Sequence, residues 1–393
     1  MKLCYDMGMK NLITGQAELD DLCRILAAQS YLAVDTEFIR EKTFWPVLCL
    51  IQVAWEPAVS DHSSGRSRGG GAVAIDPMAG LDLTPFLALL SDERITKIFH
   101  AARQDLEIFY RLMGRVPAPV ADTQIMALAL GYQDQIAYDR LMNAVLKRKL
   151  SKGHRFTDWA RRPLTEAQME YALGDVTHLL DAYHVMVAEL EQRGRTGWLV
   201  DEYADLMNAE NYSANPEAAW QRVKIRTDDA KVLGRLRALA AWREREAQRK
   251  DLPRPWVMKD EVLVELALSA PRDANAIMNV RGLGKVSPGQ AENLITLMRE
   301  AEPLHVPSAP DYTPAPEAVV ELLRVLLRHV SEQERINLKL IASPADLNNF
   351  AIGQPSMLTA GWHYEAFGRH AEALMRGELW MGLENRRLAL RGS

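Results

Sequence analysis

The chain has 393 residues, of which 48% are hydrophobic and 25% charged, a composition typical of a globular protein with a sizeable core. Its length predicts two or three domains. The net charge of −5 gives no overall attraction to a polyanion, so a nucleic-acid partner would have to be bound by local basic patches. The first residues, Met-Lys-Leu-Cys-Tyr-Asp, place an acid where a signal peptide needs an apolar stretch, so we expect no signal peptide. The sequence has no uninterrupted apolar run of about 18 residues, so we also expect no membrane span.

The cysteine content predicts a reducing compartment. Cys4, Cys23 and Cys49 are widely spaced and form no CxxC pair. This pattern predicts neither a zinc site nor a disulfide framework, and it fits the cytoplasm.

Residues 31–38, Tyr-Leu-Ala-Val-Asp-Thr-Glu-Phe, form the first informative strand pattern. Side chains alternate faces along a strand, so Asp35 and Glu37 point the same way. Burying two adjacent carboxylates costs several kcal/mol unless something compensates their repulsion. A divalent cation is the simplest compensation, because Mg²⁺ and Mn²⁺ prefer carboxylate oxygens. The competing interpretation is a solvated strand end.

Strands and helices alternate up to about residue 205, which predicts an α/β domain. The expected strands begin near residue 11 and cover residues 31–38, 47–54, 72–76 and 96–100. The Gly/Ser/Arg-rich stretch within residues 56–72 is expected to be a flexible surface loop. A helix following residue 101 carries Asp105, and Asp122 is expected to cap the next helix rather than act in catalysis.

Residues 144–162 are rich in Lys and Arg, with Phe156 and Trp159 interleaved, a pattern that suits phosphate contact and base stacking but also suits a solvated loop. A long helix follows over residues 165–193, with a capping signal at Thr165 and Gln168. On that helix Tyr171 and Asp175 are four residues apart and share a face.

Four acids and one tyrosine on these separate elements form one candidate catalytic set. These residues are Asp35, Glu37, Asp105, Tyr171 and Asp175. Four acids can hold two divalent ions, which stabilise the attacking and leaving oxygens of a phosphodiester displacement. A tyrosine near such ions can position or deprotonate the attacking water, although its ordinary pKa is near 10.

Beyond residue 205 the patterns predict helices only. Residues 222–254 are basic with a helical apolar stripe, and further helices are expected over 259–268, 272–279 and 287–300. Residues 302–316 contain five prolines and are expected to form a linker, followed by a last helical block. The predicted domains are 1–208, 209–302 and 317–393, with the linker assigned to 303–316.

The order D-x-E, then His100-Ala-Ala-Arg-Gln-Asp105, then Tyr171-x-x-x-Asp175 resembles the DEDD exonucleases of the tyrosine subtype. The resemblance extends to ribonuclease D in particular. It is carried by Asp35-Thr-Glu-Phe38, Leu50-Ile-Gln-Val53, Ile75-Asp-Pro77, Asp122-Thr-Gln124, Asp158-Trp159 and Arg162-Pro-Leu-Thr-Glu166. Residues 215–300 are similar to the HRDC domain of that family, and the block after 315 resembles a second, more divergent copy.

This resemblance implies a ribonuclease H-like fold with a mixed five-stranded sheet flanked by helices, followed by two small all-α HRDC-type domains. It implies a 3′→5′ exoribonuclease that releases nucleoside monophosphates, typically from transfer RNA precursors, using two divalent ions, Mg²⁺ or Mn²⁺. Asp35, Glu37 and Asp175 would hold the first ion, Asp35 would bridge to the second with Asp105 nearby, and Tyr171 would orient the attacking water. We expect a cytoplasmic monomer.

Further candidates and alternative functions remain open. Possible substrate contacts are Phe38, Gln104, Lys152, Arg155 and Trp159, of which Phe38, Gln104 and Trp159 could equally be structural. The alternatives to an exoribonuclease are a DNA 3′→5′ exonuclease, distinguished by contact with the 2′-OH, and a non-enzymatic nucleic-acid adaptor. The presence of all four acids and the tyrosine argues against the adaptor.

Overall fold

The computed structural model describes residues 11–56, 70–150, 157–283, 287–306 and 315–392. They form two compact units. The first contains the described residues within 11–37, 48–211 and 315–392, and the second contains those within 38–47 and 212–306. Lys152, Arg155 and the Gly/Ser/Arg-rich stretch at 57–69 lie outside the described residues.

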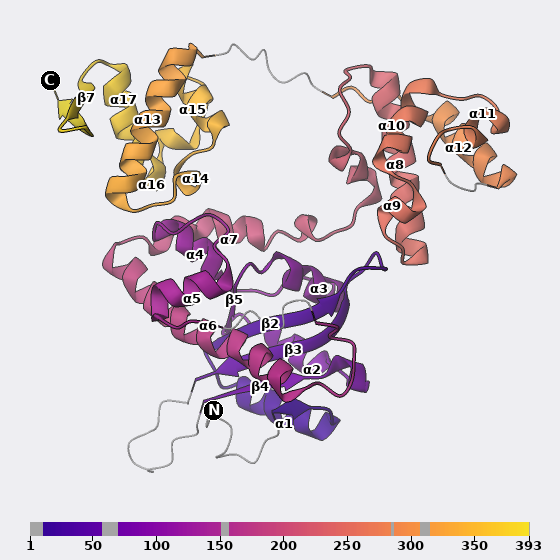
Figure 1. Ribbon diagram of the computed structural model, residues 1–393, viewed down its shortest axis with the longest axis horizontal. Coiled ribbons are helices and arrows are strands. Elements are labelled where there is room, and N and C mark those ends of the chain that lie inside the picture. Colours follow the sequence, from indigo (N-terminus) through magenta and orange to yellow (C-terminus); the bar gives the residue numbers. More distant parts are fainter. Residues whose placement is uncertain (1–10, 57–69, 151–156, 284–286, 307–314, 393) are drawn as a thin grey trace. The chain divides into compact units, whose positions relative to one another are not determined.

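A mixed sheet of six strands forms the centre of the first unit (Figure 1). Its strands are β1 (Leu12–Ile13), β2 (Tyr31–Ile39), β3 (Val47–Trp55), β4 (Gly71–Ile75), β5 (Thr96–Phe99) and β6 (Val120–Asp122). Their order is β1-β4-β3-β2-β5-β6. β2 pairs with β5 in parallel and β3 pairs with β4 antiparallel, so the long β2 lies inside the sheet.

The expectation of five strands was wrong by one. The additional strand, β6, pairs in parallel with β5 and is fully buried. It has only three residues, too few for alternation to be visible in the sequence, and its last residue Asp122 also caps the following helix.

Helices cover the sheet of this unit. They are α1 (Gln16–Leu26), α2 (Thr84–Leu90), α3 (Arg103–Met113), α4 (Thr123–Ala129), α5 (Tyr138–Leu146), α6 (Glu166–Gln192) and α7 (Val200–Leu206). The longest, α6, contacts β4 and β5 and packs against α4 and α5. It begins with the expected capping box, in which Thr165 and Gln168 satisfy each other's backbone N–H groups.

The C-terminal block packs into the same unit and shares an apolar core with α4 and α6. Its elements are α13 (Glu317–Glu334), α14 (Leu338–Ile341), α15 (Pro344–Ala351), α16 (Gly361–His363), α17 (Arg369–Met375), β7 (Leu379–Glu384) and β8 (Arg387–Gly392). The stacked rings of Trp198 and Trp362, 4.5 Å apart between centroids, join the two parts. The buried Arg195 guanidinium donates to the carbonyl oxygens of Ala129 and Glu334 at 2.9 and 2.7 Å.

The strands β7 and β8 correct the expectation that this block is entirely helical. They form an antiparallel hairpin whose turn residues, Asn385 and Arg386, have φ of 51° and 64°. Positive φ at both central residues is the requirement of the type I′ hairpin turn. The apolar residues on one face of the hairpin, Leu379, Met381 and Leu390, pack against the core.

The second unit is built from α8 (Ala230–Lys250), α9 (Arg254–Val257), α10 (Asp260–Ser269), α11 (Ala274–Met278) and α12 (Pro288–Glu300). These agree with the expected helices to within a few residues. Residues 38–47 belong to this unit, where the Asp251 carboxylate accepts hydrogen bonds from the backbone N–H groups of Phe44 and Trp45 at 3.1 and 3.0 Å. The fully buried Glu244 is paired with Arg254 through two hydrogen bonds of 2.6 Å.

Among the described residues, none of the helices is both long and apolar enough to span a membrane.

Gly131 allows the C-terminal block to approach α4. It has φ of 85°, and a Cβ atom added there would lie 2.5 Å from the Arg335 carbonyl oxygen. We predict that Gly131→Ala lowers the free energy of unfolding by about 2 kcal/mol or more, because left-handed strain and a backbone clash add together. Urea denaturation measures this loss.

Gly80→Ala is the matched control. Gly80 has φ of 78° with nothing within 4 Å of the added Cβ, so this variant incurs the conformational cost alone. Equal losses in the two variants would show that the close approach at Gly131 contributes nothing to stability.

Candidate active site

The paired carboxylates lie where β2 predicts them. Asp35 and Glu37 are partly exposed, whereas their neighbours Val34 and Thr36 are buried. Asp35 and Glu37 therefore project from one face of the strand, as alternation requires.

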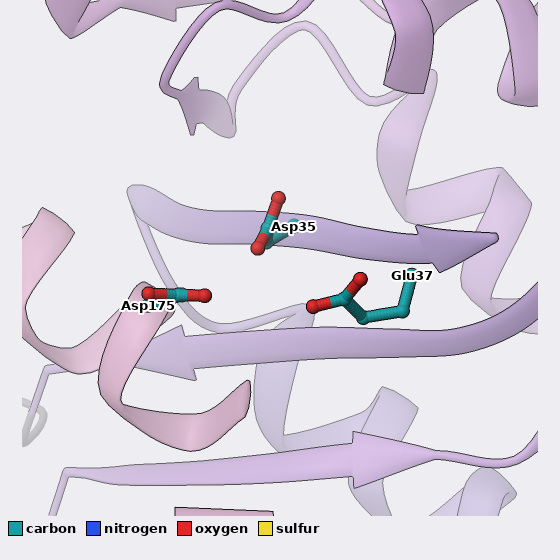
Figure 2. Close-up of side chains that lie close together, drawn as sticks. All are labelled: Asp35, Glu37 and Asp175. Atoms are coloured by element: carbon teal, nitrogen blue, oxygen red, sulfur yellow. The ribbon is translucent and has the colours of Figure 1, made fainter. Parts of the chain in front are cut away.

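Asp175 joins this pair from α6. One carboxylate oxygen from each of Asp35, Glu37 and Asp175 lies within 4.8 Å of the other two. Figure 2 shows the three side chains converging, two from the strand and one from the helix. Clustered carboxylates that remain reachable from solvent are a suitable ligand set for Mg²⁺ or Mn²⁺, so the residues present fit a divalent cation.

Asp105 lies on a different helix, α3, and contacts the same strand, β2. The register of β5 against β2 ends at Ala33–Ile98, and the chain then turns into α3, whose first turn contains Asp105. The buried Asp105 carboxylate accepts a hydrogen bond from the Thr36 hydroxyl, between the two acids of β2. Asp105 is thus beside the cluster and tied to its strand, but it is not one of the three acids whose oxygens converge.

The acids perturb one another strongly. Burial raises the pKa of Asp35 to about 7. Burial and the charge of Asp35 raise the pKa of Asp175 to about 8. Burial, followed by the charges of Asp35, Asp175 and Asp105, raises the pKa of Glu37 to about 10. A cluster that resists ionisation in this way gains stability from a bound cation.

Tyr171 lies one helical turn before Asp175 and donates its hydroxyl to that carboxylate. Burial, together with the charges of Asp175, Glu37 and Asp35, raises the pKa of the Tyr171 phenol above its ordinary value. Without a cation the phenol is therefore a neutral hydrogen-bond donor at the edge of the acidic cluster, a state suited to orienting water.

Two further groups fix the site, and the sequence patterns did not identify them. The Tyr138 hydroxyl donates to the backbone carbonyl oxygen of Asp175. The second group is Thr36, whose hydroxyl donates to Asp105. In the sequence it could be recognised only as the residue between the two acids of β2. Tyr138 gave no local signal, because its role depends on α5 packing against α6.

Asp122 acts as the expected cap and also braces α3. Its carboxylate accepts from Gln124 N–H at 2.8 Å, and also from Ala101 and Ala102 N–H at 3.0 and 2.8 Å. It thereby holds the turn with positive φ at Ala101, just before the helix that carries Asp105. His100 is bonded to Thr123 and to a backbone carbonyl, in keeping with a structural role.

The candidate substrate contacts differ in their surroundings. Phe38 is partly exposed and Gln104 is exposed. Trp159 is only 2% exposed, with its ring centroid 6.2 Å from that of Tyr171, so it supports the tyrosine rather than presenting a surface to a base.

Comparison with protein families agrees with this architecture. Residues 11–191 match a family model described as 3′-5′ exonuclease, and residues 232–287 match the HRDC domain model. The match to one HRDC model does not extend to the C-terminal block, so a second HRDC-like copy there remains a prediction.

Individual proteins are similar over nearly the whole chain. Ribonuclease D of Sphingobium indicum is 43% identical, covering 98% of this chain and 99% of the relative. Ribonuclease D of Granulibacter bethesdensis is 39% identical, covering 96% of each chain. The crystal structure of Escherichia coli RNase D, described as an exoribonuclease involved in structured RNA processing, superposes with a TM-score of 0.74 at 29% identity. The superposition covers 94% of this chain and 99% of the Escherichia coli chain. The chain therefore belongs to the ribonuclease D family of 3′→5′ exoribonucleases, which is typically metal-dependent.

Proposed function

We propose that the chain shortens RNA one nucleotide at a time, with Asp35, Glu37, Asp105, Tyr171 and Asp175 as its catalytic residues. The observation that carries this proposal is the convergence of three carboxylates from β2 and α6, with the Tyr171 phenol bonded to one of them. In each cycle a water oxygen forms a bond to the terminal phosphorus and the bond from phosphorus to the 3′ oxygen breaks. The products are a nucleoside 5′-monophosphate and an RNA one nucleotide shorter.

The acids have distinct roles in this proposal. Asp35, Glu37 and Asp175 would hold one divalent ion, and the neighbouring Asp105 would help Asp35 to hold a second. Mg²⁺ and Mn²⁺ suit an all-carboxylate ligand set. When bound, such a pair of ions supplies charge stabilisation for both the attacking and the leaving oxygen. The Tyr171 hydroxyl orients the attacking water.

The substrate and setting are proposed on the family resemblance. We propose transfer RNA precursors as substrates, with Phe38 and Gln104 near the terminal nucleotide and the basic segment 222–254 of the predicted HRDC domain 209–302 contributing to RNA binding. The domain boundaries that we propose are 1–208 for the nuclease, 209–302 for the HRDC domain, 303–316 for the linker and 317–393 for the C-terminal domain. We also propose that the protein is a monomer and that it acts in the cytoplasm. The sparse cysteines support the cytoplasmic location.

Digestion of 5′-labelled RNA and DNA of matched sequence tests the function. With Mg²⁺ or Mn²⁺ we expect a one-nucleotide ladder on RNA, and none with EDTA. Asp35→Asn should reduce the rate by about 10³-fold or more, because a metal ion contributes several kcal/mol and each 1.4 kcal/mol is about tenfold. RNA binding should be retained.

Asp20→Asn is the control for that variant, since Asp20 is exposed on α1 of the same unit. A ladder on DNA as strong as that on RNA would favour a DNA exonuclease. Persistence of metal-dependent cleavage in Asp35→Asn would remove Asp35 from the site.

Tyr171→Phe separates positioning from binding. We predict that kcat falls by about 10²-fold while KM changes by less than about threefold, because an oriented hydroxyl acts in the transition state. Steady-state kinetics on a short RNA measures both constants. Tyr183→Phe, on the same helix, serves as control and should retain kcat. An unchanged kcat in Tyr171→Phe would reject its role.

Cation binding should depend on pH in a defined direction. The folded protein holds the pKa of Asp35 at about 7 and that of Asp175 at about 8, above the ordinary value for aspartate near 3.9. Without metal, the stability from these protonated acids is complete below about pH 4 and is lost as the pH rises through 7 to 8. Metal binding requires the ionised acids, so the rise in Tm caused by Mg²⁺ should be larger at pH 8 than at pH 5.

Thermal unfolding with and without Mg²⁺, measured from pH 5 to pH 8, checks this expectation. In Asp35→Asn the metal-free Tm at pH 8 should be unchanged or higher, because one repelling charge is gone, and the Mg²⁺ effect should shrink. A Mg²⁺ effect that is equal at both pH values would contradict carboxylate ligation by this cluster.

A further inference from the structure

Two segments that carry the family resemblance, Ile75-Asp-Pro77 and Arg162-Pro-Leu-Thr-Glu166, contain no residue with a role in the proposed chemistry. The structure joins them. The Arg162 Nε donates to Asp76 Oδ2 and its Nη2 donates to Asp76 Oδ1, each at 2.7 Å. This is a two-bond pairing between the end of β4 and the segment that leads into α6.

The same guanidinium binds three carbonyl oxygens. Its Nη2 donates to Cys49 O on β3 at 2.7 Å, and its Nη1 donates to Trp159 O and Arg161 O at 2.7 and 3.1 Å. Each of the three guanidinium nitrogens thus has a hydrogen-bond acceptor in a fixed planar arrangement. A lysine ammonium has three rotatable donors from a single nitrogen, so it cannot reproduce this pattern.

The pairing is well shielded from solvent on the carboxylate side. Only 6% of the Asp76 side chain is exposed, against 26% of the Arg162 side chain. The Asp76 carboxylate also accepts from Met78 N–H at 3.0 Å, which fixes its orientation. A bidentate pair anchored at both ends is a rigid support, because neither partner can rotate without breaking several hydrogen bonds.

The segment held by this support contacts Tyr171. Trp159, whose carbonyl oxygen Arg162 binds, is buried with its ring centroid 6.2 Å from the Tyr171 ring at an interplanar angle of 35°. Arg162 is also only three residues before Thr165, the cap of α6. The support therefore holds the backbone of the residue whose indole packs on the tyrosine, and it lies close in the chain to the start of the helix that carries the tyrosine.

We propose that Arg162 is a positioning residue for catalysis, which holds Trp159 against Tyr171 through its pairing with Asp76 and so keeps the phenol aligned with Asp175. This inference rests on the proposed role of Tyr171. Arg162 touches no reacting atom in this proposal, and its effect passes through the tyrosine.

A double-mutant cycle with Arg162→Lys and Tyr171→Phe tests the proposal on the full-length protein. Arg162→Lys alone should lower kcat on a short RNA by about tenfold with KM within about twofold, as expected for a small misplacement of a catalytic group. In the Tyr171→Phe background, Arg162→Lys should cause no further loss of kcat, because the hydroxyl that it positions is absent. The loss of Tm caused by Arg162→Lys should be the same in both backgrounds.

Arg195→Lys is the matched control. Arg195 is a buried guanidinium of the same unit that also binds backbone carbonyl oxygens, and it lies between α4 and α13. This variant should lower Tm without changing kcat. If Arg162→Lys does not fold, Asp76→Asn replaces it in the same cycle, because it removes the charge and one acceptor while leaving the carbonyl contacts available.

The outcomes separate the two hypotheses. If Tyr171→Phe lowers kcat but Arg162→Lys lowers it by the same factor in both backgrounds, the support is merely structural and this inference is overturned. The same follows if Arg162→Lys leaves kcat unchanged. If Tyr171→Phe itself retains full kcat, the proposed role of the tyrosine fails, and the inference fails with it.

Discussion

Mutual repulsion among carboxylates is the constraint on which the site depends. Asp35, Glu37 and Asp175 bring oxygens within 4.8 Å of one another in a partly buried position. Burial and neighbouring charge raise the pKa of each of them. A fold that brings these acids together against their repulsion has to hold them on rigid elements, because flexible segments would let them move apart.

The rigid elements are a strand inside the sheet and one long helix. β2 sets Asp35 and Glu37 on one face through its pleat, and its intervening Thr36 binds Asp105. α6 sets Tyr171 and Asp175 one turn apart. Because α6 also packs on β4, β5 and the neighbouring helices, its position relative to β2 is determined by the core of the unit rather than by the acids. Folding energy from apolar burial is thus available to oppose the repulsion.

The nuclease part of the chain does not build this core alone. Residues of α13 and α15 share an apolar cluster with α4 and α6, and Arg195 and the Trp198–Trp362 stack join the two segments. The C-terminal block is therefore a stabilising part of the unit that contains the acidic cluster. Removing it exposes apolar surface of the nuclease, so loss of activity in a truncated chain would not by itself show that this block binds RNA.

By itself, the sequence determined the type and order of most elements and the identity of the acidic set. Alternation at Asp35 and Glu37, helical spacing at Tyr171 and Asp175, and the capping box at Thr165 are local features that depend on neighbouring residues alone. Only the tertiary structure decided that β6 and the β7–β8 hairpin form, that Trp159 is buried, and that Asp105 is bonded to Thr36 beside the three convergent acids. The pairing of Arg162 with Asp76 was likewise invisible, although both residues stood in conspicuous motifs. These features depend on which distant segments meet, and that is set by packing of the whole core, which no local period in the sequence encodes.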